Sequence, residues 1–197
     1  TRFDNVKTIQ LEDPQSHRWI LDDVLWFLNC NFTRNGKSAS QCIALRSDGI
    51  QLLEADSGKI LWTFQDPDHI DWGNSVRGCP STFQPDRCAL MEDTNGNDSD
   101  EIVFAHPDKP ELLCLDGETG QQLWRSNLLE SAGIQTPNAG SFCPIVLQEF
   151  ADANGALSLA VVVACHAPAL SKTERWLLSV DPATGKVRWN VARQQMP

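Results

Sequence analysis

Short apolar segments, each followed by a turn and a second apolar segment, recur along the chain. The clearest lie at residues 49–53, 111–115 and 175–180, and their apolar residues do not follow the 3.6-residue spacing of an amphipathic helix. Each segment leads into a turn that contains a glycine, and a tryptophan follows four residues after that glycine. The pattern predicts three strand-turn-strand hairpins and an all-β fold.

The three hairpins share one sequence motif, aligned in register, which we term the repeated phrase. Its copies span residues 54–62, 116–124 and 181–189. In every copy an Asp or Glu opens the turn, a Ser or Thr precedes the glycine, and a Trp ends the phrase. The glycine permits a positive φ, and the Asp, Ser and Thr side chains can bond the amides of the turn. The Trp falls on the second strand, where we expect its flat ring to pack between neighbouring sheets.

A further loop and strand precede each hairpin. The middle copy has loop 93–101 before strand 102–105, and the first copy keeps only the strand end at 22–27. A unit of about 60 residues built from loop-strand and strand-turn-strand is typical of a four-stranded propeller blade. The sequence therefore predicts a β-propeller segment of about three four-stranded blades, with bounds at 1–64, 65–126 and 127–197.

Three blades do not close a ring. Since propellers of this type close with roughly six to eight blades, we expect the segment to be part of a larger ring. Further blades of a longer ectodomain, other copies or a partner would complete it.

The hairpins and the loop before the middle hairpin resemble the repeats of two known families. The hairpins at 119–124 and 184–189 resemble the blades of quinoprotein-type, PQQ-like β-propellers, and the stretch 93–105 resembles the calcium loop of FG-GAP repeats in integrin alpha-chain propellers. Together they resemble FG-GAP-repeat-containing single-pass membrane glycoproteins, over about residues 20 to 190. This resemblance implies an ectodomain propeller whose membrane anchor lies outside the chain.

The loop 93–101 carries oxygen-bearing residues at alternate positions. Asp93, Asn95 and Asn97 occupy positions one, three and five, Ser99 offers its carbonyl at seven, and Glu101 offers a carboxylate at nine. Calcium binds such oxygens, and the resemblance implies a structural Ca²⁺ ion here. Asn97 and Glu101 depart from the FG-GAP pattern, which has a carboxylate at five and Asp at nine. The alternative is an ion-free turn in which the same side chains bond to backbone amides.

Two N-glycosylation sequons begin at Asn31 and Asn97. Together with seven cysteines they favour an oxidising compartment, so we expect an extracellular or cell-surface location. A glycan at Asn97 would crowd an ion in the same loop, and we expect Asn97 to be unmodified if calcium binds.

The cysteine spacing suggests disulfides that close short loops. The expected pairs are Cys30 with Cys42, Cys79 with Cys88 and, as a further possibility, Cys143 with Cys165. Cys114 lies in an apolar run, and we expect it to be a buried free thiol.

The composition and the motifs of the sequence argue against several classes of function. The net charge of −10 repels a phosphate backbone, so nucleic acid is not expected as a partner. No stretch approaches the roughly 20 apolar residues of a membrane-spanning helix. The four histidines are scattered without a hydrolase motif, and a quinoprotein dehydrogenase would need an axial pocket that three blades cannot enclose. We therefore expect neither an enzyme nor a PQQ cofactor.

The sequence predicts a binding or adhesion platform of a secreted or cell-surface glycoprotein, with protein partners. Candidate contact loops are residues 29–41 and 65–78. The second contains Trp72, which turn chemistry does not require and which is equally suited to packing between blades. The alternative function is a structural or folding-accessory ectodomain subunit of a membrane complex.

Overall fold

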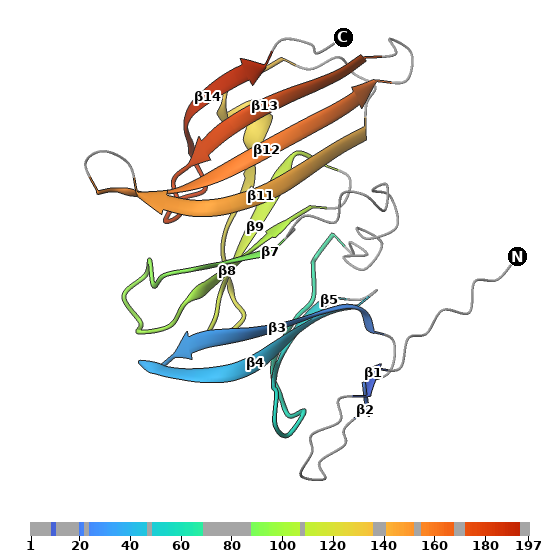
Figure 1. The fold of residues 1–197 in the computed structure, drawn as a ribbon, viewed down its shortest axis with the longest axis vertical. Coiled ribbons are helices and arrows are strands. Elements are labelled where there is room, and N and C mark those ends of the chain that lie inside the picture. Colours follow the sequence, from blue (N-terminus) through green and yellow to red (C-terminus); the bar gives the residue numbers. More distant parts are fainter. Residues whose placement is uncertain are drawn as a thin grey trace, which may run out of the picture.

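Strands make up nearly all of the regular structure (Figure 1). A computed structural model describes residues 9–10, 20–21, 24–46, 49–68, 88–106, 109–135, 141–151, 155–167 and 172–193. Two short strands, β1 (Ile9–Gln10) and β2 (Ile20–Leu21), pair with each other, and α1 (Leu128–Ser131) is a single helical turn. Within these ranges no helix has the length and apolar character needed to cross a bilayer.

The remaining strands form three antiparallel sheets of four, each in strict chain order. The first blade contains β3 (Val24–Arg34), β4 (Lys37–Arg46), β5 (Gly49–Glu54) and β6 (Ile60–Phe64). The second blade contains β7 (Cys88–Met91), β8 (Glu101–Ala105), β9 (Glu111–Asp116) and β10 (Gln122–Asn127). The third blade contains β11 (Ser141–Ala151), β12 (Leu157–Ala167), β13 (Lys172–Val180) and β14 (Val187–Arg193). The predicted all-β fold with three four-stranded blades is confirmed.

The three blades are stacked one on another along the long axis of the molecule (Figure 1). Alternate residues of the middle blade face opposite neighbours, because successive side chains of a strand point to opposite faces. Ile102 and Phe104 belong to the core shared with the first blade, whereas Val103 and Ala105 belong to the core shared with the third. All four side chains are at most 2% exposed, so the middle blade is buried on both faces.

The shared phrase folds as predicted. Gly58, Gly120 and Gly185 have φ values of 67°, 72° and 70°, in the left-handed region that favours glycine. The amide of each glycine donates to the carbonyl of the acid that opens the phrase, at 2.9, 2.8 and 2.8 Å. The three turns therefore have one geometry.

The first blade differs from expectation between residues 29 and 41. This stretch is no surface loop; it belongs to the long hairpin β3–β4, which turns at Asn35 and Gly36 with φ values of 51° and 67°. An Asn-Gly pair with two positive φ angles is the preferred two-residue turn of a hairpin, because it matches the twist of the strands.

The predicted disulfide between Cys30 and Cys42 is not formed. Cys42 is a free, fully buried thiol whose Cα pairs with Asn29, while Cys30 pairs with Gln41. Neighbouring residues of a strand face opposite sides of the sheet, so Cys42 lies on the face opposite to Gln41.

The other cysteines are placed as follows. Cys114 is a free thiol with no exposed surface, as predicted. Cys88 is buried at the start of β7, and its predicted partner Cys79 lies outside the described residues. The backbones of Cys143 and Cys165 pair with Ala164 and Phe142 respectively, and their disulfide stays a prediction.

Candidate functional site

The loop between β7 and β8 is organised by Asp93. One carboxylate oxygen accepts the amides of Asn95, Gly96 and Asn97 at 3.1, 2.6 and 3.2 Å, and the other accepts the amide of Asp98 at 2.8 Å. Burial opposes ionisation, but these four donors outweigh it and lower the pKa of Asp93. The Asp residue therefore fixes the loop in one shape.

Asp116 joins this loop to the turn of the same blade. Its Oδ1 accepts from the amide and hydroxyl of Thr119 at 2.7 and 2.6 Å. Its Oδ2 accepts from the side-chain amides of Asn95 at 2.8 Å and Asn97 at 2.5 Å. Burial opposes ionisation, yet these donors lower the pKa of Asp116. Sequence reasoning missed this residue as part of the site because it treated Asp116 only as the opening acid of its turn.

Asn97 uses both ends of its side chain inside the loop. Its Oδ1 accepts the amide of Ser99 at 2.9 Å while its Nδ2 donates to Asp116. A glycan is attached through that same nitrogen and would occupy the space toward Asp116. The folded loop therefore disfavours a glycan on Asn97.

Glu101 is the buried acid of the loop. It has no exposed surface, its Oε2 accepts the amide of Thr94 at 2.8 Å, and its Oε1 has no hydrogen-bond partner. Burial is the main cause that raises the pKa of Glu101 from 4.5 to about 7; the bond from Thr94 lowers it, and the carboxylates of Asp93 and Asp116 raise it further. An acid held in this way is stabilised either by a proton or by a cation.

The loop fits a calcium ion in its donor chemistry. Carboxylate and amide oxygens are the ligands that calcium prefers, and the unpartnered Oε1 of Glu101 would be one of them. Across the described residues no three His, Cys, Asp or Glu side chains are arranged to hold a metal. An ion here would therefore need Asn oxygens or main-chain carbonyls as well. The hydrogen bonds present are those of the ion-free turn.

The side chain of Ser99 makes a contact that the sequence did not predict, while the role of its carbonyl as a calcium ligand stays a prediction. Its side chain is 1% exposed, and its hydroxyl accepts the amide of Asn35 at 3.0 Å. Asn35 belongs to the tip of hairpin β3–β4, so Ser99 reaches across to the first blade.

Further bonds complete this contact, which we term the hairpin clasp (residues 33–36 with 98–100). The amide of Gly36 donates to the carbonyl of Asp98 at 2.7 Å, and the amide of Asp100 donates to the carbonyl of Thr33 at 2.9 Å. The amide of Thr33 also donates to the side chain of Asp100 at 2.6 Å. The clasp fixes the loop of the second blade to the first blade.

A second contact between blades is made by tryptophan. The indole nitrogen of Trp62 donates to the carbonyl of Gly117 at 2.8 Å, and its ring lies against Gly120. The indole nitrogen of Trp124 donates to the carbonyl of Pro182 at 2.8 Å, and its ring lies against Gly185. Each of these two tryptophans thus docks on the turn of the next blade, as the sequence predicted in outline.

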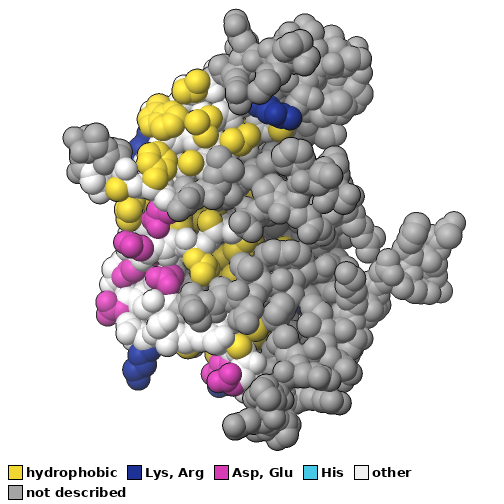
Figure 2. Space-filling model, in the orientation of Figure 1, with side chains coloured by type: hydrophobic (Ala, Val, Ile, Leu, Met, Phe, Trp, Pro, Cys, Tyr) yellow, Lys and Arg dark blue, Asp and Glu magenta, His cyan; other side chains and the backbone are white. Residues whose placement is uncertain are grey.

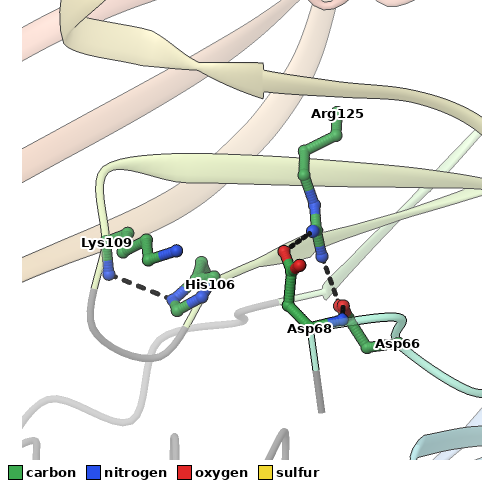
Figure 3. Close-up of polar contacts among 5 residues, drawn as sticks. All are labelled: Asp66, Asp68, His106, Lys109 and Arg125. Carbon is green, nitrogen blue, oxygen red and sulfur yellow. Dashed lines mark hydrogen bonds and ion pairs between the residues drawn. The ribbon is translucent and has the colours of Figure 1, made fainter. Parts of the chain in front are cut away.

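An ion pair fastens the connection that leaves the first blade (Figure 3). Arg125 of β10 pairs with Asp66 and, at 2.8 Å, with Asp68. Nearby, His106 accepts the backbone amide of Lys109 at its Nδ1, at 3.0 Å. Sequence reasoning did not single out these contacts, because they join residues that carry no motif.

Two predicted site residues are described only in part or not at all. Trp72 lies outside the described residues, and of Asn31 only the backbone is described, in β3 opposite Ser40. Of the predicted calcium ligands, the structure brings together Asp93, Asn95, Asn97 and Glu101, and it turns the Ser99 hydroxyl toward the hairpin clasp.

Three stacked antiparallel meanders, joined by a Trp of one blade on the turn of the next, define a segment of a β-propeller. The comparisons agree with this class. A family model described as outer membrane protein assembly factor BamB, with PQQ-type repeats, matches residues 46–197, and the chain belongs to this family. A search of curated proteins finds no match. The resemblance to FG-GAP repeats and membrane glycoproteins receives no support from these comparisons.

Proposed function

We propose that this propeller domain is a non-catalytic protein-binding platform at the cell surface or in the secretory space. The observation that carries the proposal is the fastening of the blades. The tryptophan docks and the hairpin clasp hold all three blades in fixed relative positions. A rigid scaffold that displays loops from successive blades suits protein recognition.

The polar chemistry of the described residues supports a binding role over a catalytic one. The Asp93 carboxylate accepts amides of its own loop, the Asp116 carboxylate accepts from Thr119 of its turn and from Asn97 of loop 93–101, and Arg125 is paired with two carboxylates. Groups held in this way stabilise loops and are not free to act on a substrate. A quinone cofactor is therefore not part of the proposal.

The secretory location rests on the sequon at Asn31. Its backbone lies in β3, four residues before the exposed turn residue Asn35. Glycopeptide mapping of protein from its natural source tests this point. The proposal predicts a glycan on Asn31 and none on Asn97, whose side-chain nitrogen is engaged with Asp116.

The second candidate function is an accessory subunit in the assembly of a membrane complex. The description of the matching family as an assembly factor favours it. The same rigid stack would then hold subunits together during assembly.

Surface labelling of intact cells followed by purification separates the two functions. Soluble or opposing-cell ligands are the expected result for a recognition platform. Membrane subunits that always co-purify are the expected result for an assembly subunit. A protein that is purified without any bound partner would contradict both proposed functions.

We also propose that loop 93–101 binds a structural calcium ion. The buried, unpartnered Oε1 of Glu101 supports it, since a cation would stabilise that oxygen and offset the neighbouring carboxylates. The ion would strengthen the loop, and through the hairpin clasp it would also strengthen the junction with the first blade.

Finally, we propose that further blades complete the ring.

A further inference from the structure

The carboxylate of Asp116 is shared between two parts of the second blade. Its Oδ1 accepts from the amide and the hydroxyl of Thr119, at 2.7 and 2.6 Å, and so holds the turn of the repeated phrase. Its Oδ2 accepts from the side-chain amides of Asn95 and Asn97, at 2.8 and 2.5 Å, and so holds loop 93–101. A movement of either Asn side chain would therefore change the hydrogen bonds of an acid that also shapes the turn.

The turn that Asp116 shapes is the surface on which Trp62 of the first blade docks. The main-chain carbonyl of Asp116 accepts the amide of Gly120 at 2.8 Å, and the ring of Trp62 lies against this glycine. The indole nitrogen of Trp62 donates to the carbonyl of Gly117, the residue that follows Asp116, at 2.8 Å. Asp116 therefore connects loop 93–101 with the junction of the first and second blades.

The junction of the second and third blades has an equivalent dock. Trp124 donates to the carbonyl of Pro182, and Asp181 opens this turn as Asp116 opens the other. The side chain of Asp181 pairs with Arg188 of β14 at 3.3 Å. The acid of this turn is thus held by a cationic side chain of its own blade.

The third blade also lacks the oxygen-bearing side chains of loop 93–101. Counted from Asp152, Ala156 and Ala160 take the places that Asn97 and Glu101 have in the second blade. A methyl side chain offers no ligand to a cation. The Trp124 dock is therefore an internal control for any effect of a cation on the Trp62 dock.

Loop 93–101 lies in acidic surroundings and contains an unsatisfied acid. Asp93 and Asp98 are exposed, and Figure 2 shows Asp and Glu side chains gathered in a band over the second blade. Within the described part of the chain, Oε1 of the fully buried Glu101 has no hydrogen-bond partner. Because the oxygen and the nitrogen of an Asn side chain share one carbon, a cation that binds the Asn oxygens of the loop also fixes the nitrogens that donate to Asp116.

We propose that Asp116 couples loop 93–101 to the Trp62 dock, so that calcium in the loop stabilises the junction of the first two blades and leaves the Trp124 dock unchanged. The inference rests on the calcium site proposed above and adds a consequence outside the loop. Asp116 is a positioning residue here, since it holds the loop on one side and the turn on the other. By thermodynamic linkage the dock must strengthen calcium binding by the same factor as calcium strengthens the dock.

Hydrogen exchange at the indole N–H groups of the intact protein, followed by NMR, tests this coupling. Saturating calcium is expected to slow exchange at Trp62 about fivefold, within the usual range of coupling between two sites, and to leave exchange at Trp124 unchanged. Calorimetric titration of the same sample with calcium reports separately whether the ion binds.

Substitutions at the docks test the reciprocal effect. Trp62→Phe removes the indole donor without changing the loop and should weaken calcium binding about fivefold, whereas Trp124→Phe, the matched control, should leave it unchanged. Asp116→Asn should abolish the response of the Trp62 indole while calcium still binds, and Asp181→Asn should retain that response. The indole signal of an unsubstituted docked tryptophan shows whether each variant is folded.

Each outcome decides the proposal. A calcium response at Trp62 alone, together with weaker calcium binding in Trp62→Phe alone, supports it. Equal responses at Trp62 and Trp124, or no response at Trp62 while calcium binds, overturn it and leave the calcium site in place. Loss of calcium binding in Asp116→Asn would make Asp116 a ligand instead of a connection and also overturns it. A parent protein that binds no calcium overturns both the coupling and the calcium site.

Discussion

The ring of Trp62 lies directly against Gly120 of the next blade. A Cβ at position 120 would come within 2.6 Å of the indole Cδ2, and φ at this glycine is +72°. Glycine is therefore required at position 120 for two reasons: the turn needs a positive φ, and the indole of the neighbouring blade leaves no room for a side chain. The same relationship between Trp124 and Gly185 shows that the junction is a repeated unit.

Substitution of the docking glycine should cost more than substitution of an ordinary turn glycine. Gly120→Ala meets both the positive φ and the indole, and we expect a loss of about 3 kcal/mol in the free energy of unfolding. Gly133→Ala is the control, since φ is +67° but nothing lies within 4 Å of the added Cβ; its cost should be about 1 kcal/mol. Urea denaturation measures both. Equal losses would contradict the docking role of Gly120.

The indole hydrogen bond should be measurable separately. Trp124→Phe removes the donor to the carbonyl of Pro182 and leaves a small cavity, so we expect a loss of about 2 kcal/mol in stability. Trp189→Phe in the 197-residue chain should change stability by less than about 0.5 kcal/mol, because its ring is 44% exposed. Thermal or urea unfolding compares the two, and a larger effect at 189 would count against this account.

The hairpin clasp should respond to Asp100. Asp100→Ala removes the acceptor of the Thr33 amide, and we expect hydrogen exchange at that amide to become about fivefold faster, the equivalent of one hydrogen bond. Asp100→Asn keeps an acceptor oxygen and should retain most of the protection. If the Ala variant exchanges as slowly as the parent protein, the side chain of Asp100 does not hold the hairpin.

Stability should depend on pH through Glu101. Its pKa rises from 4.5 in the unfolded chain to about 7 in the fold, so the folded state holds the proton more tightly between these values. Without calcium, stability should therefore be fully present below pH 4.5 and fall as pH rises to about 7, by up to about 3 kcal/mol.

Glu101→Gln isolates this effect, because the amide cannot titrate. Burial also raises the pKa of Glu149, but that contribution is common to the parent and the variant. Asp93 and Asp116, with lowered pKa values, lose their contributions only below about pH 4. Urea midpoints across this range should differ in slope between the two proteins; identical slopes would show that Glu101 is not the titrating group.

Calcium should stabilise the folded protein at neutral pH. At about tenfold above its dissociation constant the ion would add about 1.4 kcal/mol, and millimolar dissociation constants are usual for weak extracellular sites. Glu101→Gln should abolish the shift, and Glu130→Gln, which removes an exposed carboxylate of α1, should keep it. No shift in the parent protein would favour the ion-free turn.

The repeated phrase made the blades predictable, since its turns depend on residues close in sequence. Gly58, Gly120 and Gly185 fix three hairpins, and the Trp after each glycine indicated packing between sheets. The hairpin at Asn35–Gly36 is also visible in the sequence as an Asn-Gly pair between strands, but the spacing of the two nearby cysteines favours a loop closed by a disulfide. Register, which depends on pairing along the whole hairpin, decided against that disulfide.

The candidate site was predictable only in part. The spacing of Asp93, Asn95 and Asn97 identified the loop, because alternate positions of a tight turn converge. The roles of Asp116 and Ser99 depend on contacts between segments far apart in the chain, 19 residues for Asp116 with Asn97 and 64 for Ser99 with Asn35. No local pattern encodes such contacts.

The central claim is that this propeller domain binds proteins and carries no catalytic cofactor. Native mass spectrometry of the intact protein, purified gently from its natural source, tests the claim most directly because it detects bound proteins and small molecules together. The account predicts a complex with a protein partner and no mass that corresponds to a quinone. A protein that appears alone, with a stoichiometric bound quinone, would contradict it.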